Sequence, residues 1–127
     1  MPKHRIFIVD DSKIQLILLE KILQNEGFVT QSFTEGWELV DAVKEQAPNL
    51  IISDIDMPCL NGFELMKEVK ERVSEKVPFF FVSSMQNQQV EQKAQKLGAS
   101  VLLKKPFSTT LLLTVVEDML GMGRIRV

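Results

Sequence analysis

Three acidic residues stand at the ends of short apolar segments, where they could bind a metal ion or attack a substrate. Asp10 and Asp11 follow residues 6–9 directly, and Asp54 closes the apolar run Leu50–Asp54. Carboxylates that are held close together repel each other, and a divalent cation removes that repulsion. An all-oxygen ligand set with few carboxylates favours a partly hydrated Mg²⁺. The sequence therefore predicts a magnesium site, provided that the fold brings these acids together.

Two further polar residues close later apolar segments. Ser83 ends the run Phe79–Ser83, and Lys105 comes directly after Val101–Lys104. An aspartate such as Asp54 becomes a nucleophile toward phosphorus when a metal ion flanks it, and it then forms an aspartyl-phosphate. A lysine ammonium group would neutralise the added charge, and a serine hydroxyl would donate a hydrogen bond to a phosphoryl oxygen. Together these residue types indicate phosphoryl transfer.

The chain alternates short apolar runs with longer amphipathic segments, and it contains no long linker or repeat. We expect five strands, each followed by a helix, near residues 6–9, 28–33, 50–54, 79–83 and 101–104. Such alternation predicts an α/β fold with a parallel sheet, helices on both faces and right-handed crossovers. Because all strands of such a sheet end along one edge, the acids, the serine and the lysine should converge there although they lie far apart in sequence.

The spacing of apolar residues predicts which face of each helix is buried. The first helix is expected to have Ser12 as its N-cap and Gly27 as its stop. A stripe at helical spacing should pack this helix on the sheet, and it comprises Ile14, Leu18 and Ile22. In the second helix, Trp37 begins a similar stripe and is also expected in the core.

The last helix, from about residue 108 to 120, carries more apolar residues than one buried face needs. Projected at about 100° per residue, they fill an arc of roughly 200°, about twice what packing against a core requires. The middle of the arc should be buried, and it comprises Leu112 and Met119. At least one flank should stay exposed, and the two flanks are Leu111 with Val115 and Leu113 with Leu120. The polar side of the helix comprises Thr114, Glu117 and Asp118.

The composition is that of an ordinary globular domain. The chain has 127 residues, a formal net charge of −2 and a pI near 5.4, so bulk electrostatics gives no support for nucleic-acid binding. No apolar run is long enough to span a membrane, and no signal peptide precedes the first strand. The lone Cys59 cannot form an internal disulfide, which suits a reducing compartment. We therefore expect one cytoplasmic domain over residues 1–127 that contacts neither nucleic acid nor membrane directly.

In order and spacing, these motifs closely resemble the receiver domain of two-component response regulators. The matching residues are Asp10-Asp11, the run from Asp54 to Pro58, Asn61-Gly62, Ser83 and Lys105-Pro106-Phe107. The resemblance covers essentially the whole chain. It implies a flavodoxin-like (βα)5 fold, a three-layer sandwich whose five-stranded parallel sheet has the order 2-1-3-4-5.

The resemblance also implies roles for the acidic residues. Asp54 would accept a phosphoryl group from a sensor histidine kinase or a phosphotransfer protein. Mg²⁺ would be held by Asp11, Asp54 and the backbone carbonyl of Asp56, with Asp10 acting through water. The approach of water to the phosphorylated site would be controlled by Asp56 and Met85.

By the same resemblance, the chain would be a signalling switch and not an enzyme. Ser83 and Lys105 would bind the phosphoryl group, and the peptide before Pro106 would be cis. The excess of apolar residues on the last helix, together with the neighbouring Leu102, predicts that the surface of the fourth helix, fifth strand and last helix binds an effector or a second copy. The family often carries an aromatic residue on the fifth strand where this chain has Leu102, and the chain has no tyrosine. The aromatic switch attributed to many receivers is therefore not expected here.

Other classes of protein fit part of the pattern. The Asp54-x-Asp56 pair also suits a phosphatase of the haloacid dehalogenase type, but in that family the further acids come last, and here the acidic pair comes first. A receiver-shaped interaction module that is never phosphorylated would lack one of the acids or the lysine, and none is missing. A flavin-binding domain of this topology would need a phosphate-cradling loop where Asp10-Asp11 would repel a phosphate. The order of the motifs favours the receiver.

Overall fold

The strands and helices alternate along the whole chain. The computed structural model describes residues 3–84, 88–98 and 101–122, and of Val101 only the backbone. The strands are β1 (Arg5–Val9), β2 (Val29–Phe33), β3 (Leu50–Asp54), β4 (Phe79–Ser83) and β5 (Val101–Lys104). The helices are α1 (Lys13–Asn25), α2 (Gly36–Glu45), α3 (Gly62–Arg72), α4 (Gln88–Lys96) and α5 (Thr109–Met119). In the part of the chain that the structure describes, no helix is long and apolar enough to cross a membrane.

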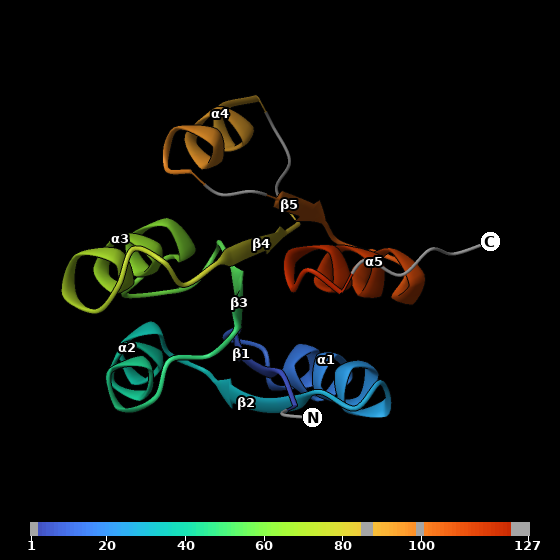
Figure 1. Cartoon of the computed structure of the whole chain (residues 1–127). Helices are drawn as coiled ribbons and strands as arrows, with labels where there is room; N and C mark the ends of the chain where they lie inside the picture. The colour runs from blue at the N-terminus through green and yellow to red at the C-terminus, as the bar shows by residue number, and fades with distance from the viewer. Residues whose placement is uncertain (1–2, 85–87, 99–100, 123–127) are drawn as a thin grey trace.

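The five strands form one parallel sheet with the order β2-β1-β3-β4-β5. Helices α1 and α5 cover one face, and α2, α3 and α4 cover the other (Figure 1). The predicted three-layer, flavodoxin-like architecture is confirmed. The chain leaves β1 toward β2 on one side and later pairs β3 on the other side of β1. Open α/β sheets place their ligand sites at the carboxyl ends of strands beside such a reversal.

Burial follows the position of each strand in the sheet. All five residues of β3 and all five of β4 are buried, as expected for strands covered on both faces. Strand β2 alternates between exposed and less exposed residues, which confirms its predicted place at an edge. Ser12 caps α1 and Gly27 follows its end with φ of +90°, so both predicted boundaries of this helix are confirmed.

The predicted buried stripe of α1 is wrong. Ile14 is 72% exposed and Leu18 is 50% exposed, and Ile22 is half-buried. The helix instead buries another stripe, which comprises Leu16, Leu19 and Leu23. The reason is that α1 has aliphatic residues almost all round, so two stripes at helical spacing compete for the sheet. The stripe that is not buried, which includes Ile14 and Leu18, leaves aliphatic side chains at the surface.

The predicted core position of Trp37 is wrong, because this residue lies at the surface. Its side chain is 45% exposed and packs against the guanidinium group of Arg72 on α3, 5.6 Å from the ring centre. The face of α2 that meets the core carries Leu39, Val40 and Val43, and Trp37 lies to one side of that face. The indole therefore links α2 to α3 from outside.

The last helix buries more of its circumference than predicted on one side. Leu112 is fully buried as predicted, whereas Met119 is only half-buried. Leu113 and Glu117 are both buried. The prediction for Glu117 is wrong, because the sequence placed this residue on the polar side of the helix. These two residues are one turn apart, so the packing that covers Leu113 covers Glu117 too. The other flank, headed by the 46% exposed Leu111, stays open as predicted.

Gly62 fixes the loop after β3 against the end of that strand. Its N–H donates to the Ile55 carbonyl at 2.9 Å, and a Cβ on Gly62 would lie 2.5 Å from the Asp54 carbonyl oxygen. Asn61 and Glu64 then start α3 with a capping box, each side chain accepting from the other residue's N–H at 2.9 Å. Only glycine allows α3 to begin so close to Asp54.

We expect Gly62→Ala to lower the free energy of unfolding by about 1–3 kcal/mol, because the added methyl group meets rigid backbone. Gly36 begins α2 and offers a matched control. A Cβ there would meet only the Leu60 side chain, at 2.8 Å, which can move aside. Gly36→Ala should therefore cost less, because alanine is also the better helix former. Urea unfolding of both variants checks this, and equal losses would contradict the argument.

Candidate functional site

The three predicted acids meet at the carboxyl ends of the two central strands. Asp10 follows β1 and Asp54 ends β3, and the carboxylates of Asp10, Asp11 and Asp54 offer oxygens that all lie within 4.8 Å of one another. Asp10 and Asp54 are buried, and Asp11 is exposed. This all-oxygen set, open to solvent on one side, fits a hard divalent cation such as Mg²⁺.

Lys105 reaches this cluster from the end of β5. Its ammonium group donates to Asp10 Oδ2 at 3.0 Å and lies 3.4 Å from Asp54 Oδ2. Its backbone N–H donates to the Ser83 carbonyl at 2.9 Å, which ties the ends of β4 and β5 together. The peptide that follows, before Pro106, is cis, as the resemblance implied. The sequence had assigned Lys105 to the charge on Asp54 and gave no sign that Asp10 would be its nearer partner.

The electrostatics of the cluster is unfavourable for an ionised Asp54. Burial first, and then the negative charge of Asp10, raise the pKa of Asp54 to about 6, against the attraction of Lys105 and a hydrogen bond from the Asp56 N–H. Burial favours the neutral amine of Lys105, but the hydrogen bond to Asp10 and the charges of Asp10 and Asp54 raise its pKa. A bound divalent cation would supply the positive charge that Asp54 lacks.

The other predicted residues lie around this cluster. Ser83 is fully buried at the end of β4, next to the strand that carries Asp54. The side chain of Asp56 is exposed, and its N–H donates to Asp54 Oδ1 at 3.3 Å. Met85 lies outside the described residues. The structure thus brings together the three acids and Lys105, with Ser83 at the neighbouring strand end and Asp56 in contact through its backbone.

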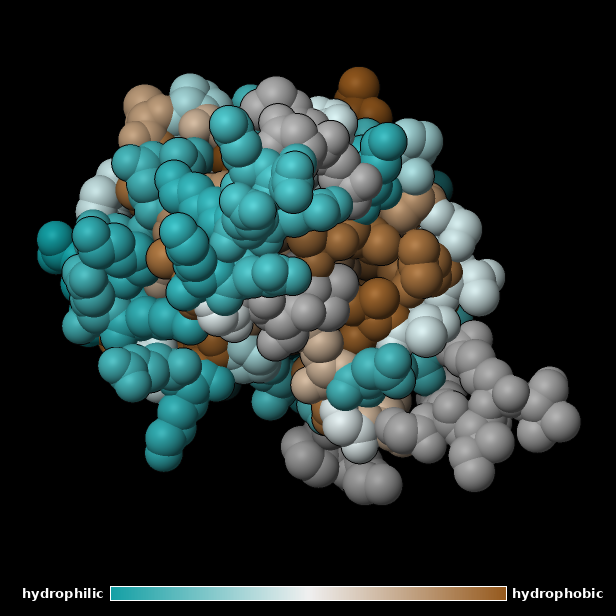
Figure 2. Space-filling view, turned by 90° about the horizontal axis from the view of Figure 1, so that it is seen from above, coloured by the Kyte–Doolittle hydropathy of each residue, from teal (hydrophilic) through white to brown (hydrophobic). Residues whose placement is uncertain are grey.

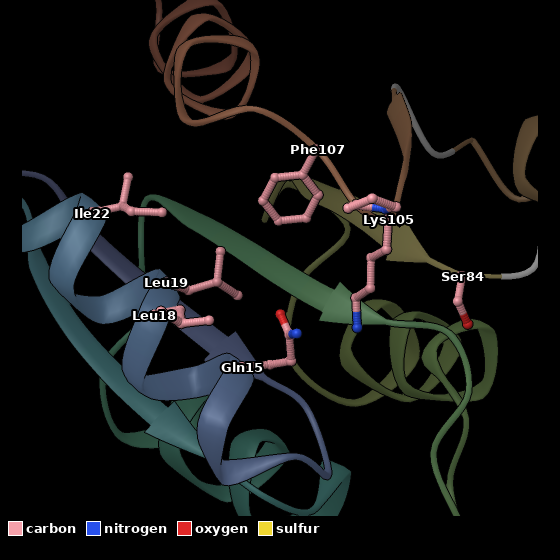
Figure 3. Close-up of a pocket in the computed structure, with 8 residues that line it drawn as sticks. Gln15, Leu18, Leu19, Ile22, Ser84, Lys105 and Phe107 are labelled. Carbon is pink, nitrogen blue, oxygen red and sulfur yellow. The ribbon is translucent and has the colours of Figure 1, made fainter.

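A cavity that the sequence did not predict opens beside the cluster. Its volume is about 510 Å³, and α1 forms one wall while the segments after β4 and β5 form the other (Figure 3). The lining residues are Gln15, Leu18, Leu19, Ile22, Ser84, Lys105, Pro106 and Phe107. The cavity therefore joins an apolar surface of α1 to the lysine of the site. To predict this cavity, one would need to know which face of α1 is turned toward the sheet, and the spacing of apolar residues does not determine that.

The sequence of this chain matches the response regulator receiver domain over residues 6–117. It is a member of that family. The chemotaxis protein CheY of Bacillus subtilis is 31% identical over 119 residues, which cover 93% of this chain and 98% of that protein. This receiver domain therefore belongs to two-component signalling, in which receivers interact with histidine kinases or phosphotransfer proteins and with effectors. The haloacid dehalogenase and flavin-binding alternatives are not supported.

Solved structures support the same fold for this receiver domain. The receiver domain of a signal transduction histidine kinase from Syntrophus aciditrophicus has a TM-score of 0.85 at 28% identity and covers 97% of this chain and 95% of that chain. The receiver domain of a sensor histidine kinase from Pseudomonas aeruginosa has a TM-score of 0.86 at 21% identity, covering 94% and 99%, and carries a magnesium ion in its active site cleft. Receivers bind Mg²⁺ at an acidic site, and the aspartate cluster of this receiver domain has the oxygens for one.

Replacing Asp54 should stabilise this receiver domain at neutral pH when no metal is present. The pKa of Asp54 is raised from 3.8 to about 6 in the folded protein. Between these pH values, Asp54 is therefore mostly protonated in the folded chain and mostly ionised in the unfolded chain. Wild-type stability therefore falls as pH rises through this window and stays low above it. We expect Asp54→Asn to raise the free energy of unfolding by about 1–2 kcal/mol at pH 7.5 and to have little effect near pH 4.

Urea unfolding in EDTA at the two pH values measures this difference, and Asp41→Asn, at an exposed site on α2, is the control. Equal stabilities of wild type and Asp54→Asn at pH 7.5 would contradict the electrostatic account.

Proposed function

We propose that residues 1–127 form a single receiver domain that acts as a phosphorylation-dependent switch, with Asp54 as the phosphoacceptor. The supporting observation is the position of the Asp54 carboxylate, which belongs to the cluster of three acids and lies 3.4 Å from the ammonium group of Lys105. The donor is a histidine kinase or a phosphotransfer protein, and the reaction requires Mg²⁺. Burying these charges costs free energy of folding, and in a receiver that only binds partners no function would require that cost.

Each residue of the site has a distinct part in the transfer. An Asp54 oxygen forms a bond to phosphorus while the bond from phosphorus to the donor nitrogen breaks. Asp11, Asp54 and the backbone carbonyl of Asp56 would hold Mg²⁺, with Asp10 acting through water, and the bound ion would supply positive charge to the reacting oxygens. Lys105 turns from Asp10 toward the new phosphoryl group, and Ser83 donates a hydrogen bond to it.

The exposed aliphatic face of α1 is the proposed docking surface for the donor. Ile14, Ile17 and Leu18 are between 50% and 72% exposed, and Leu18 also lines the cavity that leads to Lys105. A protein that presents a phosphorylated histidine to Asp54 has to come within bonding distance of the site. An apolar contact immediately beside the site would hold it there.

Incubation with acetyl phosphate and Mg²⁺ should add the mass of one phosphoryl group to the wild type. We expect no addition in EDTA, because the carboxylates then repel the donor, and none in Asp54→Asn, which lacks the nucleophile. Asp41→Asn, which removes an exposed acid of α2, should be labelled like the wild type. Mass spectrometry of the intact chain measures the result, and full labelling of Asp54→Asn would refute the assignment.

We propose that the output surface is formed by α4, β5 and α5. Leu111 is 46% exposed, and Leu102 and Val115 are half-buried. Seen from the side of α4 and β5, a hydrophobic area lies beside the hydrophilic residues of the opposite half (Figure 2). Exposed apolar areas of this kind often bind other proteins. The occupant proposed here is a second copy, which binds after phosphorylation has moved Lys105 and the linked ends of β4 and β5.

Sedimentation velocity with beryllofluoride and Mg²⁺, which mimic the phosphoryl group, should show more dimer than the same protein without them. Leu111→Lys should abolish this gain, because it places a charge in the apolar contact. Ile17→Lys puts the same charge on the exposed face of α1 and should leave the dimer intact. A wild type that stays monomeric in every condition would exclude self-association and leave a heterologous effector as the partner of this surface.

A further inference from the structure

The cavity beside the phosphorylation site has few polar side chains. Of the residues that line it, Gln15, Ser84 and Lys105 have polar side chains. Ser84 is exposed to solvent, and Lys105 is paired with Asp10 and Asp54. The transfer mechanism uses Lys105 and the residues around it. Gln15 and Ser84 have no part in that mechanism, and of these two only Gln15 is half-buried.

The side-chain amide of Gln15 is not used by the fold. The residue is half-buried, and its backbone N–H donates to the N-cap oxygen of Ser12 at 3.4 Å. Within residues 3–84, 88–98 and 101–122, its amide makes no hydrogen bond or ion pair with the protein. Gln15 and Lys105 extend into the same hollow from its two walls (Figure 3). A half-buried amide in this position is satisfied by water or by a ligand.

The chemistry of an aspartyl-phosphate leaves one position to be provided for. Lys105, Ser83 and the acidic metal site account for the three terminal oxygens of the phosphoryl group. What remains is the in-line position opposite the Asp54 oxygen, where a water molecule must stand in order to attack phosphorus. The resemblance to receivers gives Asp56 and Met85 control over the approach of this water, but it assigns no residue that orients it. An amide has an acceptor and donors but is no base, so it can orient a water without deprotonating it.

We infer that Gln15 is a positioning residue for the hydrolysis of the aspartyl-phosphate. Its carbonyl oxygen accepts a hydrogen bond from the attacking water. The water oxygen forms a bond to phosphorus while the bond between phosphorus and the Asp54 oxygen breaks, and that electron pair returns to the carboxylate. The water proton ends on the released inorganic phosphate. Gln15 thereby shortens the phosphorylated state, an inference that rests on the proposed phosphorylation of Asp54.

Gln15→Ala is the decisive variant, because it removes the amide without adding bulk and places a strong helix former in α1. The protein is labelled with acetyl phosphate and Mg²⁺, separated from the donor and followed by intact mass. We expect the phosphorylated half-life to lengthen about tenfold, which corresponds to about 1.4 kcal/mol in the barrier. Gln15→Met keeps the length of the side chain but has no amide, and it should lengthen the half-life as Gln15→Ala does, whereas a role that is only steric would leave its half-life at the wild-type value.

Gln24→Ala is the matched control on the same helix. The Gln24 amide donates to Thr30 Oγ1 at 2.8 Å, away from the cavity, so its loss should leave the half-life unchanged. A half-life of Gln15→Ala equal to or shorter than that of the wild type would overturn the inference, because an amide that merely covers the phosphoryl group would admit more water when removed. A wild type that takes up no phosphoryl group would overturn the proposed function together with this inference.

Discussion

The repulsion between buried carboxylates is the constraint on which the site depends. Asp10 and Asp54 are buried side by side, and the single ammonium group of Lys105 lies nearer to Asp10, at 3.0 Å, than to Asp54, at 3.4 Å. The pKa of Asp54 is accordingly raised to about 6. A carboxylate in this state gains from any added positive charge, so that metal binding and phosphoryl transfer both act on energy already stored in the fold.

Rigid packing keeps these charges close. Every residue of β3 is buried, and the parallel pairing of β3 with β1 and β4 sets the height of Asp54 relative to Asp10 and Ser83. The loop after β3 is held against the strand by the contact at Gly62, where a side chain would collide with backbone. The acids therefore cannot relieve their repulsion by moving apart, because the sheet and this loop would have to deform.

The sequence predicts the sheet and the cluster better than it predicts the surfaces of the helices. Strands buried on both faces appear as continuous apolar runs, and their carboxyl ends locate Asp54, Ser83 and Lys105 without knowledge of side-chain packing. Spacing leaves the rotation of a helix open when apolar residues surround it, and for that reason the stripe of α1 was assigned to Ile14 and Leu18. The same ambiguity concealed the cavity and Gln15. The nearer pairing of Lys105 with Asp10 depends on side-chain conformation, which no sequence pattern encodes.

The position of Lys105 connects these local facts to signalling. Its side chain joins the ends of β1 and β3 through Asp10 and Asp54, and its backbone N–H joins β5 to β4 through the Ser83 carbonyl. The next two residues, Pro106 and Phe107, line the cavity next to α1, and α5 begins soon after them. A phosphoryl group on Asp54 would attract the ammonium group away from Asp10. Because one residue carries the charge contact, the strand link and the start of the segment leading to α5, its movement would alter the donor side and the output side together.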